Sequence, residues 1–147
     1  MKVGVLLSGC GYLDGSEIQE AVCSLLALDQ LQVSSVCLSI EGKQTNVVSH
    51  LNGKEQAEER TILEESARIA RGKILSLSQT DVSQLDALMI PGGFGCALNL
   101  CDFALQGEEM TVNQQVSELI QSFFSQKKPI GAICIAPVLI AKVLGHH

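Results

Sequence analysis

The sequence contains no tryptophan and a single tyrosine, so its core must be built mostly from leucine, isoleucine, valine and alanine. It is also poor in basic residues, with 10 lysines and arginines against 16 acidic residues and a formal net charge of −6. Binding to nucleic acid requires clustered lysine and arginine, and anionic membrane surfaces attract the same clusters. The charge balance therefore argues against nucleic acid and membranes as partners.

Long apolar runs and export signals are missing as well. No run approaches the ~20 apolar residues that a membrane-spanning helix requires. No secretory signal is visible, because Lys2 leads directly into the apolar segment 3–7. The 147 residues, 46% hydrophobic and 18% charged, fit a single globular domain with one core. We predict one domain over 1–147, located in the cytoplasm.

The cysteines and histidines do not form a metal-binding pattern. Cys96 and Cys101 are separated by four residues, which is not a usual zinc spacing, and no second pair completes a site. We expect no metal and no cofactor, and we expect the six cysteines to be reduced thiols. His50 lies in a polar segment and is expected to be solvated, while His146 and His147 stand at the chain end and are native or part of a tag.

The apolar pattern alternates between strand and helix periods, which predicts an α/β fold with a mostly parallel sheet covered on both faces. This is a flavodoxin-like three-layer α/β/α sandwich. The expected strands are 2–8, 32–40, 73–77, 87–90 and 128–134. The expected helices are 16–29, 55–71, 111–126, with Thr111 and Gln114 as a capping box, and 136–144.

The segment 128–137 is the most informative stretch. Pro129, Ile130 and Gly131 suit a short strand that ends at Cys134, and Pro137 suits the first turn of a helix. A sharp strand-to-helix turn exposes the side chain at its apex, and the dipole of the following helix favours a thiolate there. The pattern predicts a nucleophile elbow that carries cysteine. A buried structural cysteine is the alternative.

Three strand ends are expected to meet in one crevice, because ligands bind at the carboxyl ends of parallel strands. These are the glycine-rich turn 9–15, the Pro91-Gly92-Gly93 turn, and Cys134. The backbone N–H groups of Gly92, Gly93 and Ile135 could then stabilise an oxyanion.

Glu17 is the carboxylate best placed to reach Cys134, because it opens the helix that follows the first strand. The alternative is a helix cap, in which Asp14 begins the helix and Glu17 is its third residue.

Two further functions are weaker. Gly9, Gly11 and Gly15 resemble a dinucleotide-binding turn, with Glu41 as a ribose ligand, but the third glycine stands one place late. A cysteine protease needs a histidine base beside the thiol, and Ile135 follows Cys134 instead. We therefore discount peptidase activity.

Taken together, the sequence resembles the ElbB family, the enhancing lycopene biosynthesis proteins, which are also described as isoprenoid biosynthesis proteins with an amidotransferase-like domain. That family belongs to the PfpI/ThiJ superfamily, whose fold is similar to class I glutamine amidotransferases. The resemblance covers essentially the whole chain. It rests on residues 7–11, 14–18, 20–22, 46–51, 67–69, 85–88, 91–95, 99–100 and 103–104, on Gly131, and on 134–137.

The resemblance implies that Cys134 is the elbow nucleophile and Glu17 its carboxylate partner. It implies a cofactor-independent glyoxalase-type lyase that converts glyoxal or a similar small dicarbonyl to a hydroxy acid through a Cys134 hemithioacetal. Glu17 would carry the proton, and Gly93 and Ile135 would hold the oxyanion. The same chemistry could act as protein deglycase activity.

Two alternatives stay open. One is a redox or stress sensor whose oxidisable group is Cys134, and the other is an accessory or glutaminase-like protein of isoprenoid metabolism. ElbB-like proteins are longer, so the resemblance also implies that the C-terminal part of the family domain is missing from 1–147. We then expect an exposed apolar edge or face on the sheet, and self-association such as a homodimer.

Overall fold

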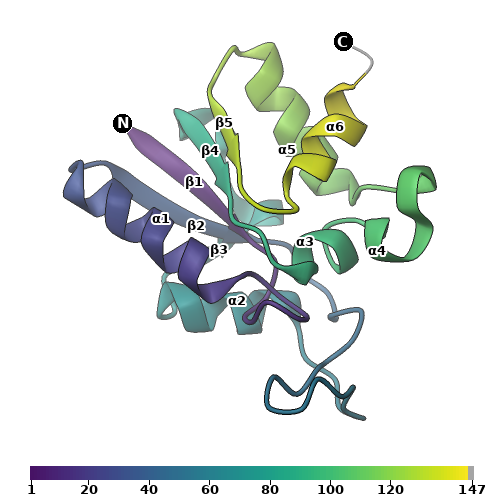
Figure 1. Ribbon diagram of the computed structural model, residues 1–147. Coiled ribbons are helices and arrows are strands. Elements are labelled where there is room, and N and C mark those ends of the chain that lie inside the picture. Colours follow the sequence, from purple (N-terminus) through teal and green to yellow (C-terminus); the bar gives the residue numbers. More distant parts are fainter. Residues whose placement is uncertain (146–147) are drawn as a thin grey trace.

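The computed structural model describes residues 1–145, which form one five-stranded, all-parallel sheet with helices on both faces (Figure 1). The strand order is β3-β2-β1-β4-β5. The strands are β1 (Lys2–Leu7), β2 (Ser34–Ser39), β3 (Ile74–Ser76), β4 (Ala87–Ile90) and β5 (Ile130–Ala132). The helices are α1 (Ile18–Gln30), α2 (Ile62–Ala70), α3 (Phe94–Leu98), α4 (Phe103–Gln106), α5 (Gln114–Ser125) and α6 (Pro137–Leu144). The predicted three-layer α/β/α fold is confirmed.

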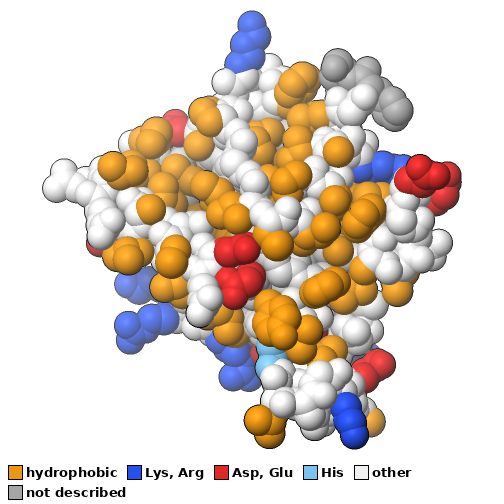
Figure 2. All heavy atoms as spheres, in the orientation of Figure 1, with side chains coloured by type: hydrophobic (Ala, Val, Ile, Leu, Met, Phe, Trp, Pro, Cys, Tyr) orange, Lys and Arg blue, Asp and Glu red, His pale blue; other side chains and the backbone are white. Residues whose placement is uncertain are grey.

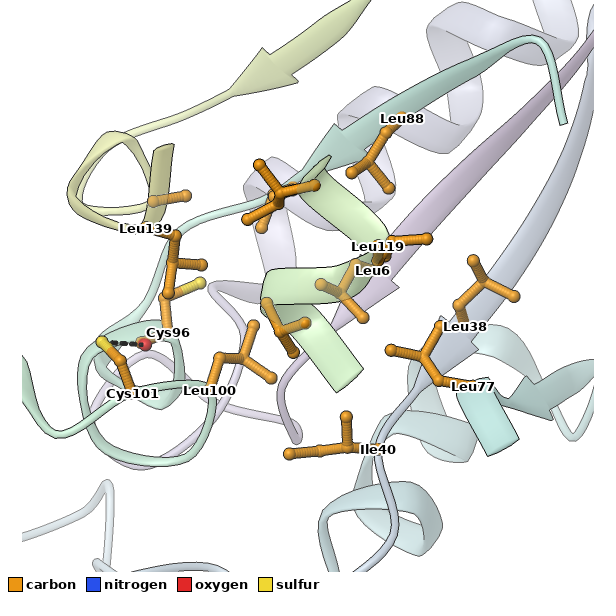
Figure 3. Close-up of a cluster of buried hydrophobic side chains, with 14 of the residues drawn as sticks. Leu6, Leu38, Ile40, Leu77, Leu88, Cys96, Leu100, Cys101, Leu119 and Leu139 are labelled. Carbon is orange, nitrogen blue, oxygen red and sulfur yellow. Dashed lines mark hydrogen bonds between the residues drawn. The ribbon is translucent and has the colours of Figure 1, made fainter. Parts of the chain in front are cut away.

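The larger of two apolar cores lies between the sheet and helices α3, α5 and α6. Alternate residues of a strand point to opposite faces, so Leu6 of β1 and Leu88 of β4 point into this core. Leu119 of α5 and Leu139 of α6 meet them from the helix side (Figure 3). This core fixes α5 and α6, and therefore the chain on both sides of β5.

The smaller core lies on the other face, under α1 and α2. Val5 and Leu7 of β1 point into it, where they are covered by Ala21 of α1 and Ala70 of α2. Ala21 is the one buried residue of α1, and Ile18, Val22 and Leu26 leave an apolar stripe exposed to solvent. The side of α1 that faces β5 lies opposite to this stripe and borders a separate hollow against Met89 and Ile133.

Several predicted boundaries differ from the structure. Helix α2 begins at Ile62 rather than at residue 55, because 55–60 are all exposed and offer no continuous apolar face. Thr61 caps α2, and two antiparallel bridges, Lys43↔Thr61 and Val48↔Glu55, hold the preceding segment in a loop. The capping box at Thr111 is also wrong: Asn113 caps α5 by accepting hydrogen bonds from the backbone of Gln115 and Val116.

Strand β5 is shorter and less buried than the sequence predicted. It pairs with β4 alone, ends at Ala132, and all three of its residues are only half-buried. Figure 2 shows apolar side chains spread over the face on which α1, β5 and α6 lie. The half-buried edge strand β5 and the exposed stripe of α1 leave apolar side chains accessible to solvent. No helix among residues 1–145 is long and apolar enough to cross a membrane.

Candidate active site at the cysteine elbow

Cys134 stands at the apex of a tight turn between β5 and α6. Its φ of 58° is left-handed, which costs a non-glycine residue on the order of 1 kcal/mol or more and is common at functional sites. The turn is tied on both sides, because Ile133 N–H donates to the Ile90 carbonyl at 3.0 Å and Ala136 N–H donates to the Ile133 carbonyl at 2.9 Å. The side chain of Cys134 is exposed. The predicted strand–turn–helix elbow is confirmed.

The Pro91-Gly92-Gly93 turn at the end of β4 packs directly against this elbow. A Cβ on Gly92 would lie 2.5 Å from the Cys134 Cβ, so only glycine allows the two segments to approach this closely. Gly93 has φ 96°, and a Cβ there would lie 2.3 Å from the Gly15 carbonyl oxygen. The three strand ends therefore meet in one crevice, as predicted.

Glu17 both caps α1 and borders the crevice. Its Oε2 accepts the Glu20 backbone N–H at 2.6 Å, and its own N–H donates to the Gly92 carbonyl at 2.9 Å. The cap expected at Asp14 is wrong, because that buried carboxylate instead accepts the Val48 N–H at 2.7 Å. The Glu17 side chain is thus both the cap of α1 and a candidate site residue.

A pocket of about 280 Å³ lies at the crevice and is lined by Tyr12, Glu17, Gly93, Phe94, Cys134 and Ile135. Tyr12 and Phe94 are half-exposed, at 51% and 50%. Neither residue was predicted from the sequence as a site residue. One feature of the sequence could have identified them. Each is an aromatic residue inside or directly after a glycine-rich turn at a strand end, in a chain that has few aromatic residues.

The predicted oxyanion donors do not all remain available. Gly92 N–H donates to Glu20 Oε2 at 2.8 Å, so Gly92 is wrong as a free donor. Within residues 1–145, the N–H groups of Gly93 and Ile135 have no hydrogen-bond partner, and both residues line the pocket. Two backbone donors of the predicted three could therefore face a substrate.

His50 does not line the pocket, and it is not simply a solvated loop residue. Its Nε2 accepts the Leu13 N–H at 3.2 Å, and its Nδ1 donates to the Val48 carbonyl at 3.1 Å in the matching tautomer. Its ring meets Tyr12 edge to face, with centroids 5.4 Å apart. His50 therefore packs against the Tyr12 ring, which lines the pocket. His146 and His147 lie outside the described residues.

The other cysteines are less suited to reaction. All six thiols are unpaired, and only Cys23 and Cys134 are exposed. Burial raises the pKa of the Cys96 thiol to about 12, and that thiol donates to the Pro91 carbonyl at 3.0 Å. Burial likewise raises the pKa of Cys10, Cys37 and Cys101. Cys134 is thus the one thiol of the described chain that lines the pocket.

Comparison with known proteins agrees with this fold. The sequence model of the DJ-1/PfpI family matches residues 13–145, and the chain belongs to this family. A solved isoprenoid biosynthesis protein with an amidotransferase-like domain from Ehrlichia chaffeensis superposes with a TM-score of 0.93 at 39% identity. That match covers 98% of this chain and 68% of the other. Drosophila melanogaster DJ-1beta shares the fold, with a TM-score of 0.57 at 22% identity, over 97% of this chain and 59% of that one.

Two curated relatives are similar at the sequence level. The ES1 protein homolog of Rattus norvegicus and the glutamine amidotransferase-like class 1 domain-containing protein 3 of Homo sapiens are each 44% identical over 144 residues. Both are named as mitochondrial proteins, whereas cytoplasmic location of this chain stays a prediction. Each match covers 97% of this chain but 54% of the relative, so the chain spans about half the length of these relatives.

Proposed function

We propose that this chain carries the thiol site of a cofactor-independent glyoxalase-type enzyme that acts on glyoxal or a similar small dicarbonyl. The observation that carries the proposal is that Cys134 and Glu17 border one small pocket, which Gly93 and Ile135 also line. A pocket of about 280 Å³ fits a substrate of a few heavy atoms. Among residues 1–145 the pocket lining contains no histidine, lysine or arginine, so its ionisable side chains are the Cys134 thiol, the Glu17 carboxylate and the Tyr12 phenol.

The reaction would begin when Cys134 Sγ adds to one aldehyde carbon of glyoxal to form a hemithioacetal. Glu17 would remove the proton from that carbon and return it to the neighbouring carbon, through an enediol, to give a thioester. The Gly93 and Ile135 N–H groups would stabilise the developing oxyanion. Water then cleaves the thioester, which releases glycolate and restores the thiol. The net reaction consumes one glyoxal and one water.

The test is glycolate formation from glyoxal by the wild type and by matched cysteine variants. Cys134→Ser is expected to fall to the uncatalysed background. Glu17→Gln is expected to lose about a hundredfold or more, because a positioned proton-transfer group contributes at least that much. Cys23→Ser removes the other exposed thiol and should keep the wild-type rate. Wild-type turnover in the Cys134→Ser variant would refute the proposal.

The accessibility contrast among the thiols also favours a second function, a peroxide sensor without turnover. Here Cys134 Sγ would gain two oxygen atoms to become a sulfinate, while peroxide is reduced to water. Peptide mass spectrometry after mild peroxide treatment should find the modification concentrated at Cys134. Oxidation spread evenly over the six cysteines would rule this function out.

A further inference from the structure

The chain has one tyrosine and four phenylalanines, and two of these aromatic residues line the pocket at Cys134. The proposed reaction of glyoxal uses neither of them. The rings of Tyr12 and Phe94 are both about half exposed. Apolar surface in contact with water is unfavourable, and an apolar group that binds there removes this surface from water. The two rings therefore offer binding energy to a group that glyoxal does not have.

The fold holds these two residues in place. Phe94 N–H donates to the Tyr12 carbonyl at 2.8 Å, which joins the turn after β1 to the turn after β4. The His50 ring packs on the Tyr12 ring edge to face, which is a preferred geometry of aromatic contacts. A Cβ on Gly11 would lie 2.4 Å from His50 Nε2, so glycine at this position allows His50 to approach. The aromatic wall of the pocket is thus fixed by contacts between segments far apart in the sequence.

The pocket is also larger than glyoxal requires. An apolar cavity of ~150 Å³ is large enough to bind benzene. The pocket at Cys134 measures about 280 Å³, so it has room for an aromatic ring beside the two carbonyl carbons that react. Glyoxal, which consists of those two carbonyl groups alone, leaves most of this volume unfilled.

The lining indicates that the additional group is uncharged. Among residues 1–145, no lysine, arginine or histidine lines the pocket, so no cation there would pair with a carboxylate or phosphate group. Moving a charged group out of water without such a partner is costly, whereas an apolar group gains from the same transfer. The side chains of Tyr12, Phe94 and Ile135 supply an apolar surface for it.

We propose that Tyr12 and Phe94 form a binding subsite for an aromatic substituent, and that the substrates of the site are neutral 2-oxoaldehydes that carry one, such as phenylglyoxal. Cys134 Sγ would add to the aldehyde carbon, the proton of that carbon would move through an enediol to the ketone carbon, and water would cleave the thioester. Phenylglyoxal and one water thus give mandelate. The substrate part rests on the proposed glyoxalase-type function. The subsite beside the thiol does not rest on it and can be measured without turnover.

The test compares alkylation of Cys134 by iodoacetamide and by N-benzyliodoacetamide, measured by peptide mass spectrometry. Both reagents are neutral, and only the second carries an aromatic ring. Each rate constant is divided by that of the same reagent with N-acetylcysteine, which corrects for intrinsic reactivity. The wild type should favour the benzyl reagent on the order of tenfold, because its ring is buried against two others. Phe94→Ala and Tyr12→Ala should each lower this preference roughly threefold or more.

Three more variants separate the subsite from general effects. Phe124→Ala is the matched control, because Phe124 is 48% exposed on α5 and lines a different hollow, and it should keep the wild-type preference. Tyr12→Phe keeps the ring and should keep the preference as well. Phe94→Leu keeps an apolar side chain and should give an intermediate preference, which tests the subsite even where alanine disturbs the fold.

Three results would overturn the subsite. The first is a wild type that does not favour the benzyl reagent. The second is an equal loss of the preference in Phe124→Ala and Phe94→Ala, and the third is a loss in Tyr12→Phe as large as that in Tyr12→Ala.

Failure of the proposed function is distinguishable from failure of this inference. A wild type that favours the benzyl reagent at Cys134, but forms neither glycolate nor mandelate, refutes the glyoxalase and upholds the subsite. If turnover is found, Phe94→Ala should lower kcat/KM for phenylglyoxal relative to glyoxal by about the factor by which it lowers the alkylation preference. An unchanged ratio of kcat/KM values in this variant would overturn the substrate part.

Discussion

The two walls of the crevice are built very differently. On the β1 side, the turn after Leu7 is buried and densely hydrogen-bonded: Ser8 N–H donates to Ser16 Oγ at 2.8 Å, and Asn99 Nδ2 donates to the Ser8 carbonyl at 2.9 Å. On the β5 side, the strand is an edge, its residues are half-buried and Cys134 is exposed. The β1 side, which we call the buried wall, holds the Glu17 carboxylate, and the β5 side, the open wall, carries Cys134.

This difference indicates where the precision of the site comes from. The elbow itself is attached by few contacts, and its position relative to Glu17 depends on Gly92, which touches Cys134 on one side and is hydrogen-bonded by Glu17 and Glu20 on the other. Changes at this junction should therefore have larger effects than changes within either wall.

The largest effect is expected from Gly92→Ala. The added methyl group would clash with the Cys134 Cβ at 2.5 Å and the Ile133 carbonyl at 3.0 Å, so elbow and turn must separate. We expect a loss of about 2 to 3 kcal/mol in unfolding free energy and a marked change in Cys134 alkylation. Urea unfolding and peptide mass spectrometry measure the two effects.

Gly131→Ala is the matched control, because the added methyl on β5 would meet mainly the flexible end of Met89 at 3.0 Å. It should cost less stability and leave Cys134 alkylation near the wild-type rate. Equal effects of the two substitutions would mean that the two walls are not joined at Gly92.

An intermediate effect on the unfolding free energy is expected at alkaline pH, and it comes from the buried thiol of Cys96. The Cys96 thiol has an ordinary pKa of 9.0 when unfolded and about 12 when folded, because burial opposes its ionisation. The unfolded state therefore releases its proton first as pH rises above 9, and the stability fully present below this pH is progressively lost. Cys96 alone should lower the unfolding free energy by up to ~1.4 kcal/mol per pH unit in this window.

Urea unfolding of the wild type and of Cys96→Ala measures how the unfolding free energy changes with pH. The measurements run from about pH 8 to about pH 10.5, because ordinary thiols have a pKa of ~8.5 to 9. The variant should show a shallower decline. Cys23→Ala, which removes an exposed thiol, should keep the wild-type slope. Identical slopes in all three proteins would contradict the assignment.

The smallest effect on stability is expected on the exposed apolar stripe of α1, which faces away from β5. Val22 is 47% exposed on the apolar stripe of α1, so Val22→Lys should change the unfolding free energy by no more than about 0.5 kcal/mol. It should nevertheless weaken self-association, because a charge is placed on the exposed apolar face. Sedimentation velocity over a concentration series measures this.

Leu51→Lys is the control for that experiment. Leu51 is 95% exposed and lies in the loop between β2 and α2, away from the apolar face. A wild type that stays monomeric at all concentrations would contradict the expected self-association, and an equal effect of both lysines would show that the α1 stripe is not the contact surface.

The sequence allowed the order of the five strands and of the four longest helices, the elbow and the meeting of three strand ends to be predicted, because apolar periodicity and turn glycines are local signals. The short helices α3 and α4 were not predicted. Contacts between distant segments could not be predicted. The Glu20 carboxylate accepts a hydrogen bond from the Gly92 N–H, 72 positions away in the sequence. His50 accepts one from the Leu13 N–H, 37 positions away. The beginning of α2 was misplaced because the bridge of Lys43 to Thr61 overrides the helical preference of the acidic segment before it.

The double use of Glu17 has a consequence for how related chains are compared. Its carboxylate satisfies a backbone donor at the start of α1, so replacing it destabilises the fold whether or not any reaction takes place. Selection for a folded chain alone is then enough to retain this glutamate after catalysis has been lost. Its presence in a sequence is evidence that the helix is capped, and evidence for activity has to come from the Cys134 thiol, which lines the same pocket.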